Sequence, residues 1–243
     1  MNDTELARQI AETAGRMLVD LRNSGLFAGK QLGQAGDQIA NAFIMRALRL
    51  NRPDDAILSE EERDNTARLS ASRVWIVDPL DGTREYGEAR ADWAVHVALA
   101  IDGVATVGAV ALPGLPLTLS SGDSLSRPHH NGKLRMLVSR TRPAAEAVAV
   151  AETLGAELIP MGSAGAKAMA VVRGEADIYL HSGGQYEWDS CAPVAVAQTA
   201  GLHVSRIDGS PLRYNQADTR LPDLLVCPKE HAARVIELAA RQD

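Results

Sequence analysis

Hydrophobic residues recur every three to four positions along the first fifty residues, which is the spacing of one face of an α-helix. They form two such runs, the first ending at Gly25 and the second at the break Arg52-Pro53-Asp54-Asp55. Asn2 and Glu5 have the spacing of a capping box, so the first helix is expected to begin there. The glycine-rich stretch 25–37 is expected to connect the two helices.

Shorter apolar runs follow the helices and predict strands. The runs 56–59 and 74–77 are β-branched or apolar, and each ends directly in acidic residues. Two longer runs, 93–101 and 104–112, flank Asp102-Gly103, a dipeptide typical of the tight turn of a β-hairpin. The first half of the chain is therefore expected to have an α+β architecture.

The pattern changes after the stretch 120–133, whose composition is typical of a loop. From there to the C-terminus, strand-like and helix-like runs alternate. Such alternation is typical of a layered α/β unit. The sequence therefore predicts an α+β half over residues 1–130 and an α/β half over residues 131–243.

Composition narrows the class of protein without indicating a chemistry. Of 243 residues, 46% are hydrophobic and 23% are charged, as in ordinary globular proteins. The formal net charge of −6 argues against binding to nucleic acid or to a membrane surface, and the longest apolar run is too short to span a bilayer. Without a secretory signal, a disulfide framework or a zinc motif, the chain is expected to be cytoplasmic.

Acidic residues cluster where the predicted elements meet loops. Glu60 follows the first short strand, Asp78 and Asp81 follow the second, and Asp189 opens a later helix. Open α/β sheets place their sites at strand ends, and Mg²⁺ prefers oxygen ligands such as carboxylates. The acids therefore predict a magnesium site.

The segment VDPLDGT (77–83) concentrates this chemistry. Its proline can direct both carboxylates and the Leu80 carbonyl to one point, Gly82 allows a ligand close to the backbone, and Thr83 adds a hydroxyl. Phosphatases of the haloacid-dehalogenase type carry their nucleophile in D-x-D-G-T, two positions before the second acid. Here the interval is three, so a covalent aspartyl-phosphate route is disfavoured.

Taken one at a time, these clusters also have simpler interpretations. The run 60–64 could be a solvated charged loop, and Asp189 could only cap its helix. Asp78 and Asp81 could cap a turn. His96 interrupts an apolar run and is expected to be a satisfied core histidine.

Three fragments, in this order along the chain, resemble the signatures of the inositol monophosphatase superfamily: LSEE (58–61), DPLDGT (78–83) and WDSCA (188–192). The resemblance extends over nearly the whole chain. It implies a layered αβαβα, inositol-monophosphatase-like fold, with an α+β half and an α/β half. It also implies a Mg²⁺-dependent, lithium-sensitive phosphomonoesterase.

Within the superfamily, the tail Arg84-Glu85-Tyr86 resembles the CysQ-type 3'(2'),5'-bisphosphate nucleotidases, as do LVSR (137–140) and the segment 161–180. Those enzymes remove the 3'-phosphate of 3'-phosphoadenosine 5'-phosphate, a by-product of sulfate assimilation, and leave AMP; some also act on the 5'-phosphosulfate. The resemblance therefore implies a small phosphate ester as substrate.

The resemblance implies a set of metal ligands. Glu60, Asp78, Asp81 and Asp189 correspond to carboxylate ligands, and the Leu80 carbonyl corresponds to a further one. Together they would hold two or three Mg²⁺ ions.

Other residues correspond to groups that hold the phosphate. Gly82 and Thr83 would receive the scissile phosphate, and Asp37 matches the acid that pairs with the threonine of the DGT signature. Gly162 and Ser163, at the start of a predicted helix, would add an anion site.

The implied reaction is in-line attack of a metal-activated water on phosphorus, without a phospho-enzyme. Either Glu60, or Thr83 polarised by Asp37, would orient and deprotonate that water. The family also implies a homodimer. A catalytically inactive ligand-binding homologue is the alternative outside enzymes, but it would lack a metal ligand, and all four carboxylates are present.

Specificity is expected to come from the second half of the chain. Ser139, Arg140, Lys167 and His181 are the candidates for binding the nucleoside and its 5'-phosphate. Two departures from the family pattern keep other substrates open, including inositol phosphates and fructose 1,6-bisphosphate. The segment GSAGAK (162–167) is one residue longer than usual, and His181 stands where several nucleotidases have an arginine.

Overall fold

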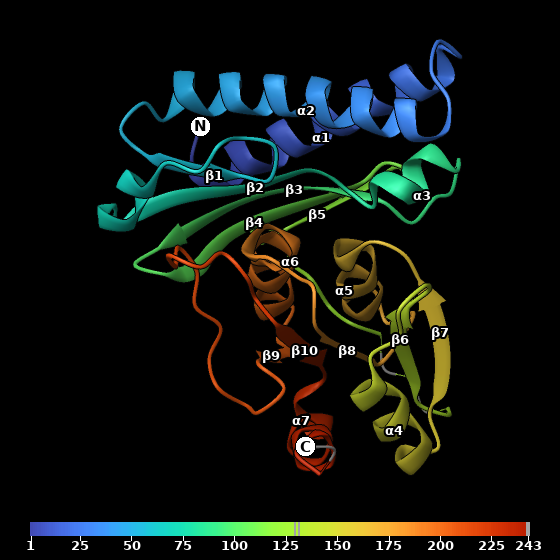
Figure 1. Ribbon diagram of the computed structural model, residues 1–243. Coiled ribbons are helices and arrows are strands. Elements are labelled where there is room, and N and C mark those ends of the chain that lie inside the picture. The colour runs from blue at the N-terminus through green and yellow to red at the C-terminus, as the bar shows by residue number, and fades with distance from the viewer. Residues whose placement is uncertain (129, 131, 242–243) are drawn as a thin grey trace.

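The computed structural model describes residues 1–128, 130 and 132–241. Figure 1 shows five stacked layers: a pair of helices, a sheet, a second pair of helices, a second sheet, and a third pair of helices. The predicted αβαβα arrangement is therefore confirmed.

Two long helices, α1 (Asp3–Asn23) and α2 (Gly29–Asn51), form the first layer. Asn2 and Glu5 make the predicted capping box, in which the Glu5 N–H donates to Asn2 Oδ1 and the Asn2 N–H donates to the Glu5 carboxylate. The apolar faces of both helices pack on the first sheet.

The expected connection over residues 25–37 is wrong for most of its length, because α2 begins at Gly29. Gly33 and Gly36 lie on the buried face of this helix. A Cβ on Gly33 would lie only 2.6 Å from Thr83 Cγ2. The glycines of this stretch thus allow close helix packing beside the DGT segment, whereas their composition alone predicts a loop.

The first sheet has the strand order β1-β2-β3-β4-β5, in which β1 and β2 are parallel and the other neighbours are antiparallel. Its strands are β1 (Ala56–Ser59), β2 (Arg73–Asp81), β3 (Ala94–Ile101), β4 (Val104–Leu112) and β5 (Leu117–Ser120). The short elements η1 (Thr66–Ser70) and α3 (Thr83–Gly87) flank β2. The predicted hairpin turns at Asp102 and Gly103, which both have positive φ, whereas β5 is not anticipated by the sequence analysis.

The middle layer consists of α5 (Ala164–Val172) and α6 (Glu187–Thr199). Their side chains are buried almost all round, since one core surrounds both helices and joins the facing surfaces of the two sheets. Helix α6 begins two residues before the predicted start at Asp189, so this aspartate lies in its first turn.

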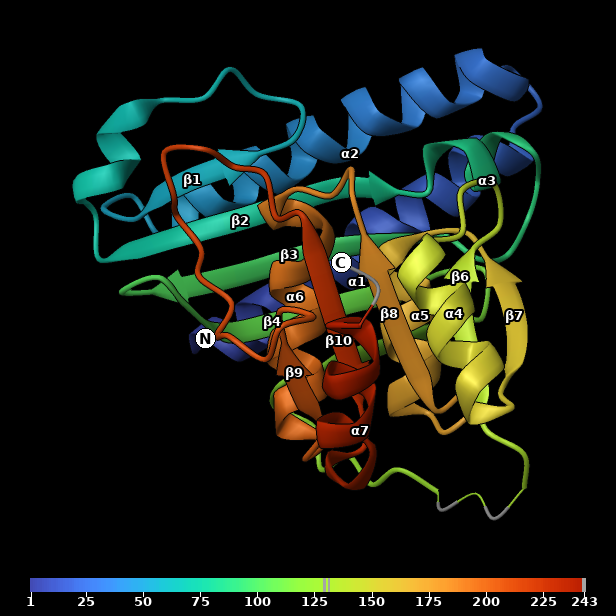
Figure 2. The same cartoon turned by 60° about the horizontal axis from the view of Figure 1, so that its bottom comes forward.

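The second sheet has the order β7-β6-β8-β10-β9, and Figure 2 shows these strands side by side. The strands are β6 (Arg135–Ser139), β7 (Glu157–Met161), β8 (Ile178–Ser182), β9 (His203–Ser205) and β10 (Asp223–Cys227). Helices α4 (Ala145–Leu154) and α7 (Lys229–Ala239) cover its outer face around a separate core. The predicted alternation of strands and helices in this half is confirmed.

The chain passes from the first sheet to the second between residues 120 and 135. The predicted boundary at residue 130 falls in this connection, and the division into two halves remains a prediction. Among the described residues, no helix combines the length and the apolar character that crossing a membrane requires.

Candidate active site

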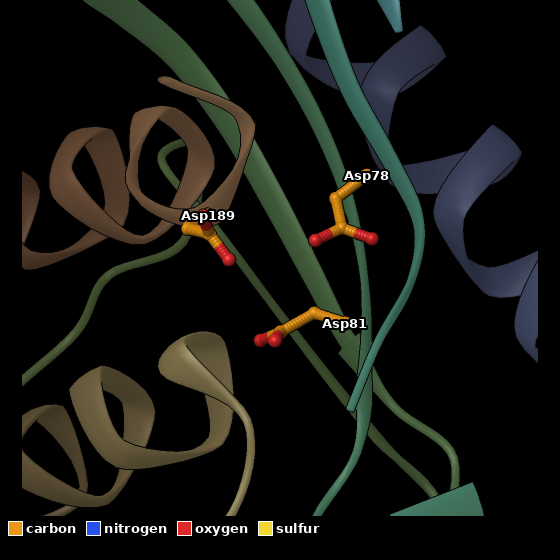
Figure 3. A group of neighbouring side chains, drawn as sticks. All are labelled: Asp78, Asp81 and Asp189. Carbon is orange, nitrogen blue, oxygen red and sulfur yellow. The ribbon is translucent and has the colours of Figure 1, made fainter. Parts of the chain in front are cut away.

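The predicted acids converge in the centre of the molecule from three separate segments. Asp78 and Asp81 come from β2, Asp189 comes from the first turn of α6, and Glu60 follows β1. Figure 3 shows the three aspartates pointing into a common space, and their carboxylates each place an oxygen within 4.8 Å of the others. We call Glu60, Asp78, Asp81 and Asp189 the acid group.

A bulge in β2 places two of these acids on one face of the sheet. Val74 and Ile76 face the middle helices, so Asp78 faces them as well. Three residues further on, Asp81 would point to the opposite face of a regular strand. The pairing register shifts between the two aspartates, and the one extra residue between them returns Asp81 to the side of Asp78. The segment 78–81 is therefore a bulged strand end.

Asp81 is the acid whose charge the protein compensates. Its carboxylate accepts hydrogen bonds from Ser163 Oγ at 2.5 Å, the Ala164 N–H at 3.1 Å and the Gly165 N–H at 2.7 Å, and His96 Nε2 lies 3.3 Å away. Burial acts to raise the pKa of this carboxyl, but the donors from His96, Ser163 and Gly165 prevail and lower the pKa to about 2.

Asp78 and Asp189 lack such compensation. Asp78 Oδ1 accepts the Leu80 N–H at 3.0 Å, and Asp189 Oδ2 accepts the Tyr186 N–H at 2.7 Å. Burial and neighbouring carboxylates raise the pKa of Asp78 well above its usual value and that of Asp189 to about 7. Asp189 thus caps the start of its helix, as the simpler interpretation has it, and also faces the other acids.

Glu60 lies at the exposed rim of the group, with its carboxyl within hydrogen-bond reach of Asp78. Desolvation of that carboxyl and the charges of Asp81 and Glu61 raise its pKa to about 6. The group thus brings together more carboxylates than there are cations beside them, and its donors are hard oxygen atoms. This donor chemistry fits Mg²⁺, which relieves the repulsion between such groups.

Thr83 and Asp37 lie beside the acid group. Thr83 Oγ1 donates to the Leu80 carbonyl at 3.1 Å, and Asp37 Oδ1 lies 3.5 Å from the same hydroxyl. Burial and the charges of Glu61 and Glu60 raise the pKa of Asp37 to about 7. The structure therefore brings the predicted pair together, with the Leu80 carbonyl as the nearer partner of the hydroxyl.

The predicted phosphate-binding residues line a cleft next to Asp81. Gly82 has a φ of 88°, a left-handed conformation that favours glycine. The Gly162 N–H donates to Asp92 Oδ2 at 2.6 Å, and the start of α5 at Ser163 donates to Asp81. Phosphate binding at this helix start remains a prediction, because these donors have partners within the protein.

The cleft has a volume of about 230 Å³ and two walls. One wall is Gly82–Glu85, and the other combines Ser139–Thr141 with Gly162, Ser163 and Lys167. Three of the four candidate substrate residues therefore lie together: Ser139, Arg140 and Lys167.

His181 lies outside the lining of this cleft. Its Nε2 is 2.7 Å from the Gly183 carbonyl, and burial lowers the pKa of the ring. Contact of His181 with a substrate remains a prediction.

Sequence reasoning missed the part played by His96. The ring is fully buried as expected, but it lies opposite Asp78 in the β2–β3 pairing and directly against Asp81. Its Nδ1 lies 3.0 Å from the Trp188 carbonyl of α6. The sequence signal for this role is one polar residue, His96, in an otherwise apolar strand. Interpreting it requires knowing that this strand pairs with the strand that carries Asp78 and Asp81.

Glu85 and Asp92 were also missed. Both accept hydrogen bonds from Arg140, at 3.0 Å and 2.6 Å. Glu85 is part of the tail that marks the resemblance to nucleotidases, and the structure places its side chain under the cleft wall, 8% exposed.

Comparison with known proteins identifies relatives over nearly the full length. The model of the inositol monophosphatase family matches residues 4–242. A 3'-phosphoadenosine 5'-phosphate phosphatase of Mycobacterium leprae is 48% identical over 242 residues, covering 93% of this chain and 89% of that protein. The 3'(2'),5'-bisphosphate nucleotidase CysQ of Escherichia coli K12 is 30% identical over 199 residues, covering 77% of this chain and 81% of that one.

Solved structures share the fold. CysQ from Bacteroides thetaiotaomicron, a bacterial member of the inositol monophosphatase family, matches with a TM-score of 0.82 and 24% identity, over 93% of this chain and 97% of that one. An inositol monophosphatase from Anabaena sp. PCC 7120 matches with a TM-score of 0.78 and 20% identity, over 98% and 94% of the two chains. The predicted inositol-monophosphatase-like fold is confirmed.

Proposed function

The chain belongs to the inositol monophosphatase family, and we propose that it is a Mg²⁺-dependent 3'-phosphoadenosine 5'-phosphate phosphatase that releases the 3'-phosphate and leaves AMP. The observation that carries this proposal is the 48% identity, over 93% of the chain, to a phosphatase named for that substrate. The acid group and the adjoining cleft supply residues suited to the reaction. The predicted family membership is confirmed by the family match.

Asp78, Asp81, Asp189 and Glu60 would hold Mg²⁺, and the Leu80 carbonyl would add an oxygen ligand. Bound Mg²⁺ supplies charge neutralisation on the phosphate and makes water more acidic. Two or three ions would match the number of oxygen donors. The donor set supports the proposal, since the hard oxygens of three carboxylates lie within 4.8 Å of one another.

The protein's own groups would hold the phosphate and move a proton. The open backbone at Gly82 and the Thr83 hydroxyl would contact the scissile phosphate. Asp37, with a pKa raised to about 7 by burial and by Glu61 and Glu60, can accept a proton through Thr83 near neutral pH. Glu60, with a pKa of about 6, is the other candidate base at the rim.

The direct test is phosphate release from 3'-phosphoadenosine 5'-phosphate, inositol 1-phosphate and fructose 1,6-bisphosphate, each with Mg²⁺ and with or without Li⁺. We expect the bisphosphate nucleotide to be preferred by about tenfold or more in kcat/KM and its turnover to fall with Li⁺. Preference for inositol 1-phosphate would contradict the substrate assignment. Absence of turnover with all three would contradict the enzymatic role.

We further propose a cytoplasmic homodimer with a boundary between its halves near residue 130, in line with the family resemblance. Light scattering after gel filtration measures the mass against 25.9 kDa for one chain. Limited proteolysis tests the boundary, with first cleavage expected between residues 120 and 135. A monomer, or first cleavage within either sheet, would contradict the corresponding proposal.

A further inference from the structure

Arg68 is a buried arginine in η1, the short helix between β1 and β2. Its side chain is 1% exposed, and Nε and Nη2 donate to the two oxygens of Asp64 at 2.7 Å and 2.9 Å. Nη1 donates to Asn215 Oδ1 at 2.8 Å, and Nη2 also donates to the Gln216 carbonyl at 3.0 Å. Asn215 Nδ2 donates back to the Arg68 carbonyl at 2.9 Å. Arg68 thus fastens its own segment to one that lies 147 residues further along the chain.

Glu187 contacts the same distant segment from α6. Its side chain is buried in the first turn of that helix. Its two carboxylate oxygens accept the Asn215 N–H at 2.6 Å and the Gln216 N–H at 2.7 Å. Asn215 has a φ of 58°, a left-handed conformation that helps two successive N–H groups face one acceptor. We call Asp64, Arg68, Asn215, Gln216 and Glu187 the arginine bridge.

The arginine bridge connects two segments that carry members of the acid group. At one end, Asp64 and Arg68 lie four and eight residues after Glu60. At the other end, Glu187 lies two residues before Asp189 in the first turn of α6. Glu60 and Asp189 come from different halves of the chain, and the bridge fixes the position of one segment relative to the other.

Arg68 is the anchor of the segment that carries Glu60. Every other residue from Glu60 to Ser70 is exposed. On the side of α2, Asn41 Nδ2 donates to Glu62 Oε1 at 3.1 Å, a bond between uncharged and exposed partners that contributes less than a buried guanidinium. An exposed segment with few buried contacts opens easily, and the ionised aspartates of the acid group repel the Glu60 carboxylate. The bonds of Arg68 oppose both effects.

We propose that Arg68 is a positioning residue for the metal site, which holds the Glu60 segment in place against α6 before Mg²⁺ binds. The assignment rests on the proposed function. Without this anchor, binding of Mg²⁺ would also have to order the segment, and the lost conformational freedom would weaken the binding. Once Mg²⁺ is bound, Glu60 reaches the same position, so the chemical step should change little.

The test uses two variants of the bridge. Arg68→Lys keeps the charge but loses the bidentate bonds to Asp64. Asn215→Gly removes the side-chain bonds to Arg68, while glycine suits the left-handed backbone and keeps the N–H that Glu187 accepts. N215G keeps the test decisive if R68K does not fold.

Arg127→Lys is the matched control. The Arg127 side chain is 11% exposed, and it donates to Asp177 and to the carbonyls of Val171 and Ala176. These contacts lie at the end of α5 that is remote from Asp81. All three variants are expected to have lower melting temperatures than the wild type, so a general loss of stability is common to them.

The measurement is the Mg²⁺ concentration at half saturation, obtained in two ways. Calorimetric titration of the protein without nucleotide gives the binding constant, and phosphate release from 3'-phosphoadenosine 5'-phosphate gives the apparent constant and kcat. In R68K and in N215G both constants should rise about tenfold, while kcat at saturating Mg²⁺ stays within about threefold of the wild type. R127K should change neither constant by more than about twofold. The double variant R68K/N215G should add less than about twofold to the larger single effect, because both changes break the same contact.

Three outcomes would overturn the assignment. These are unchanged Mg²⁺ constants in the bridge variants, an equal rise in R127K, or a fall in kcat at saturating Mg²⁺ with no change in the constants. A wild-type protein that neither binds Mg²⁺ nor hydrolyses the nucleotide would instead overturn the proposed function.

Discussion

The acid group and the cleft wall beside it differ in whether the protein balances their charges. In the acid group, Asp78 is buried and Asp189 is half-buried, neither has an ion-pair partner among the described residues, and their pKa values are raised. On the cleft wall, Arg140 has two carboxylate partners and Lys167 has two carbonyl partners. The acid group therefore carries negative charge that the protein does not balance, whereas the charges of the wall have partners within the protein.

Asp81 belongs to both regions. It is one of the acid group, yet the start of α5 and His96 satisfy its carboxylate. Asp81 connects the acid group to α5, the helix that carries Lys167, so the acid group and the cleft are held in a fixed relation. Acids of one cluster therefore differ: Asp78 and Asp189 have no ion-pair partner among the described residues, and Asp81 also holds the structure together.

The largest expected effect comes from Asp189→Asn. The variant loses a metal ligand, so Mg²⁺-dependent phosphate release should fall by at least about a hundredfold. The metal-free protein should keep or raise its melting temperature, because the change removes repulsion from Asp81 while the amide oxygen still accepts the Tyr186 N–H. Turnover and thermal melts in EDTA measure both effects; more than a tenth of the activity remaining would refute the metal role.

Asp81→Asn should lose activity to a similar degree and also lose stability. Its carboxylate accepts charge-assisted bonds from Ser163, Ala164 and Gly165, and an amide turns an NH₂ group toward donors. We expect the free energy of unfolding in EDTA to fall by about 2 kcal/mol. Urea denaturation of both variants, Asp81→Asn and Asp189→Asn, measures their free energies of unfolding. Equal free energies would contradict the proposed difference between the two acids.

The stability of the metal-free protein should depend on pH. Asp37 and Asp189 have folded pKa values of about 7, above the ordinary aspartate value of 3.8, so between those values the folded state holds more protons than the unfolded state. Stability of the metal-free protein should therefore be fullest near pH 4, fall as pH rises and level off above about pH 7. Mg²⁺ requires ionised ligands, so the rise in melting temperature on adding it should grow from pH 5 to pH 8.

A metal-free protein whose stability rises between pH 5 and pH 7 would contradict this account of the acid group. Asp208→Asn is the matched control, because Asp208 is exposed and its pKa is lowered by hydrogen bonds to Ser210. That variant should retain the wild-type dependence on Mg²⁺.

The smallest expected effect comes from a substitution in the cleft wall. Asp92→Asn weakens the bonds to Arg140 and to the Gly162 N–H, so the free energy of unfolding should fall by about 1–2 kcal/mol. Activity on all phosphate esters should fall together, by less than about tenfold. Glu88→Gln, at an exposed ion pair with Arg90, serves as the control. A selective change in substrate preference would show that this carboxylate does more than position the wall.

Much of the fold is readable from local pattern because the pattern and the packing agree. The helix from the Asn2 capping box and the hairpin at Asp102-Gly103 are confirmed, since capping and turn chemistry act within a few residues. The start of α2 is not readable in this way. Glycines at 33 and 36 suit a loop by composition. Close packing explains them as helix residues, Gly33 against Thr83 and Gly36 against Leu80, Tyr86 and Leu18.

The candidate site likewise has features that the local sequence predicts and features that only the tertiary structure shows. The residue types and spacing of VDPLDGT indicate oxygen ligands and argue against a covalent aspartate. The side of the sheet on which Asp81 lies follows from the bulge between Asp78 and Asp81, which spacing alone does not reveal. Likewise, Arg140 is a reasonable substrate residue by position, and its commitment to Glu85 and Asp92 depends on side chains 55 and 48 residues away.

By itself, the sequence determined which acids exist, their order, and the chemistry that their oxygens can perform, because these depend on residue type and short spacing. Tertiary structure alone decided which charges are balanced: the start of α5 and His96 satisfy Asp81, and two carboxylates occupy Arg140. Electrostatic compensation acts through space at a few ångströms, between segments far apart in the chain. The local pattern therefore does not indicate which basic side chains of the cleft are already bound to the protein.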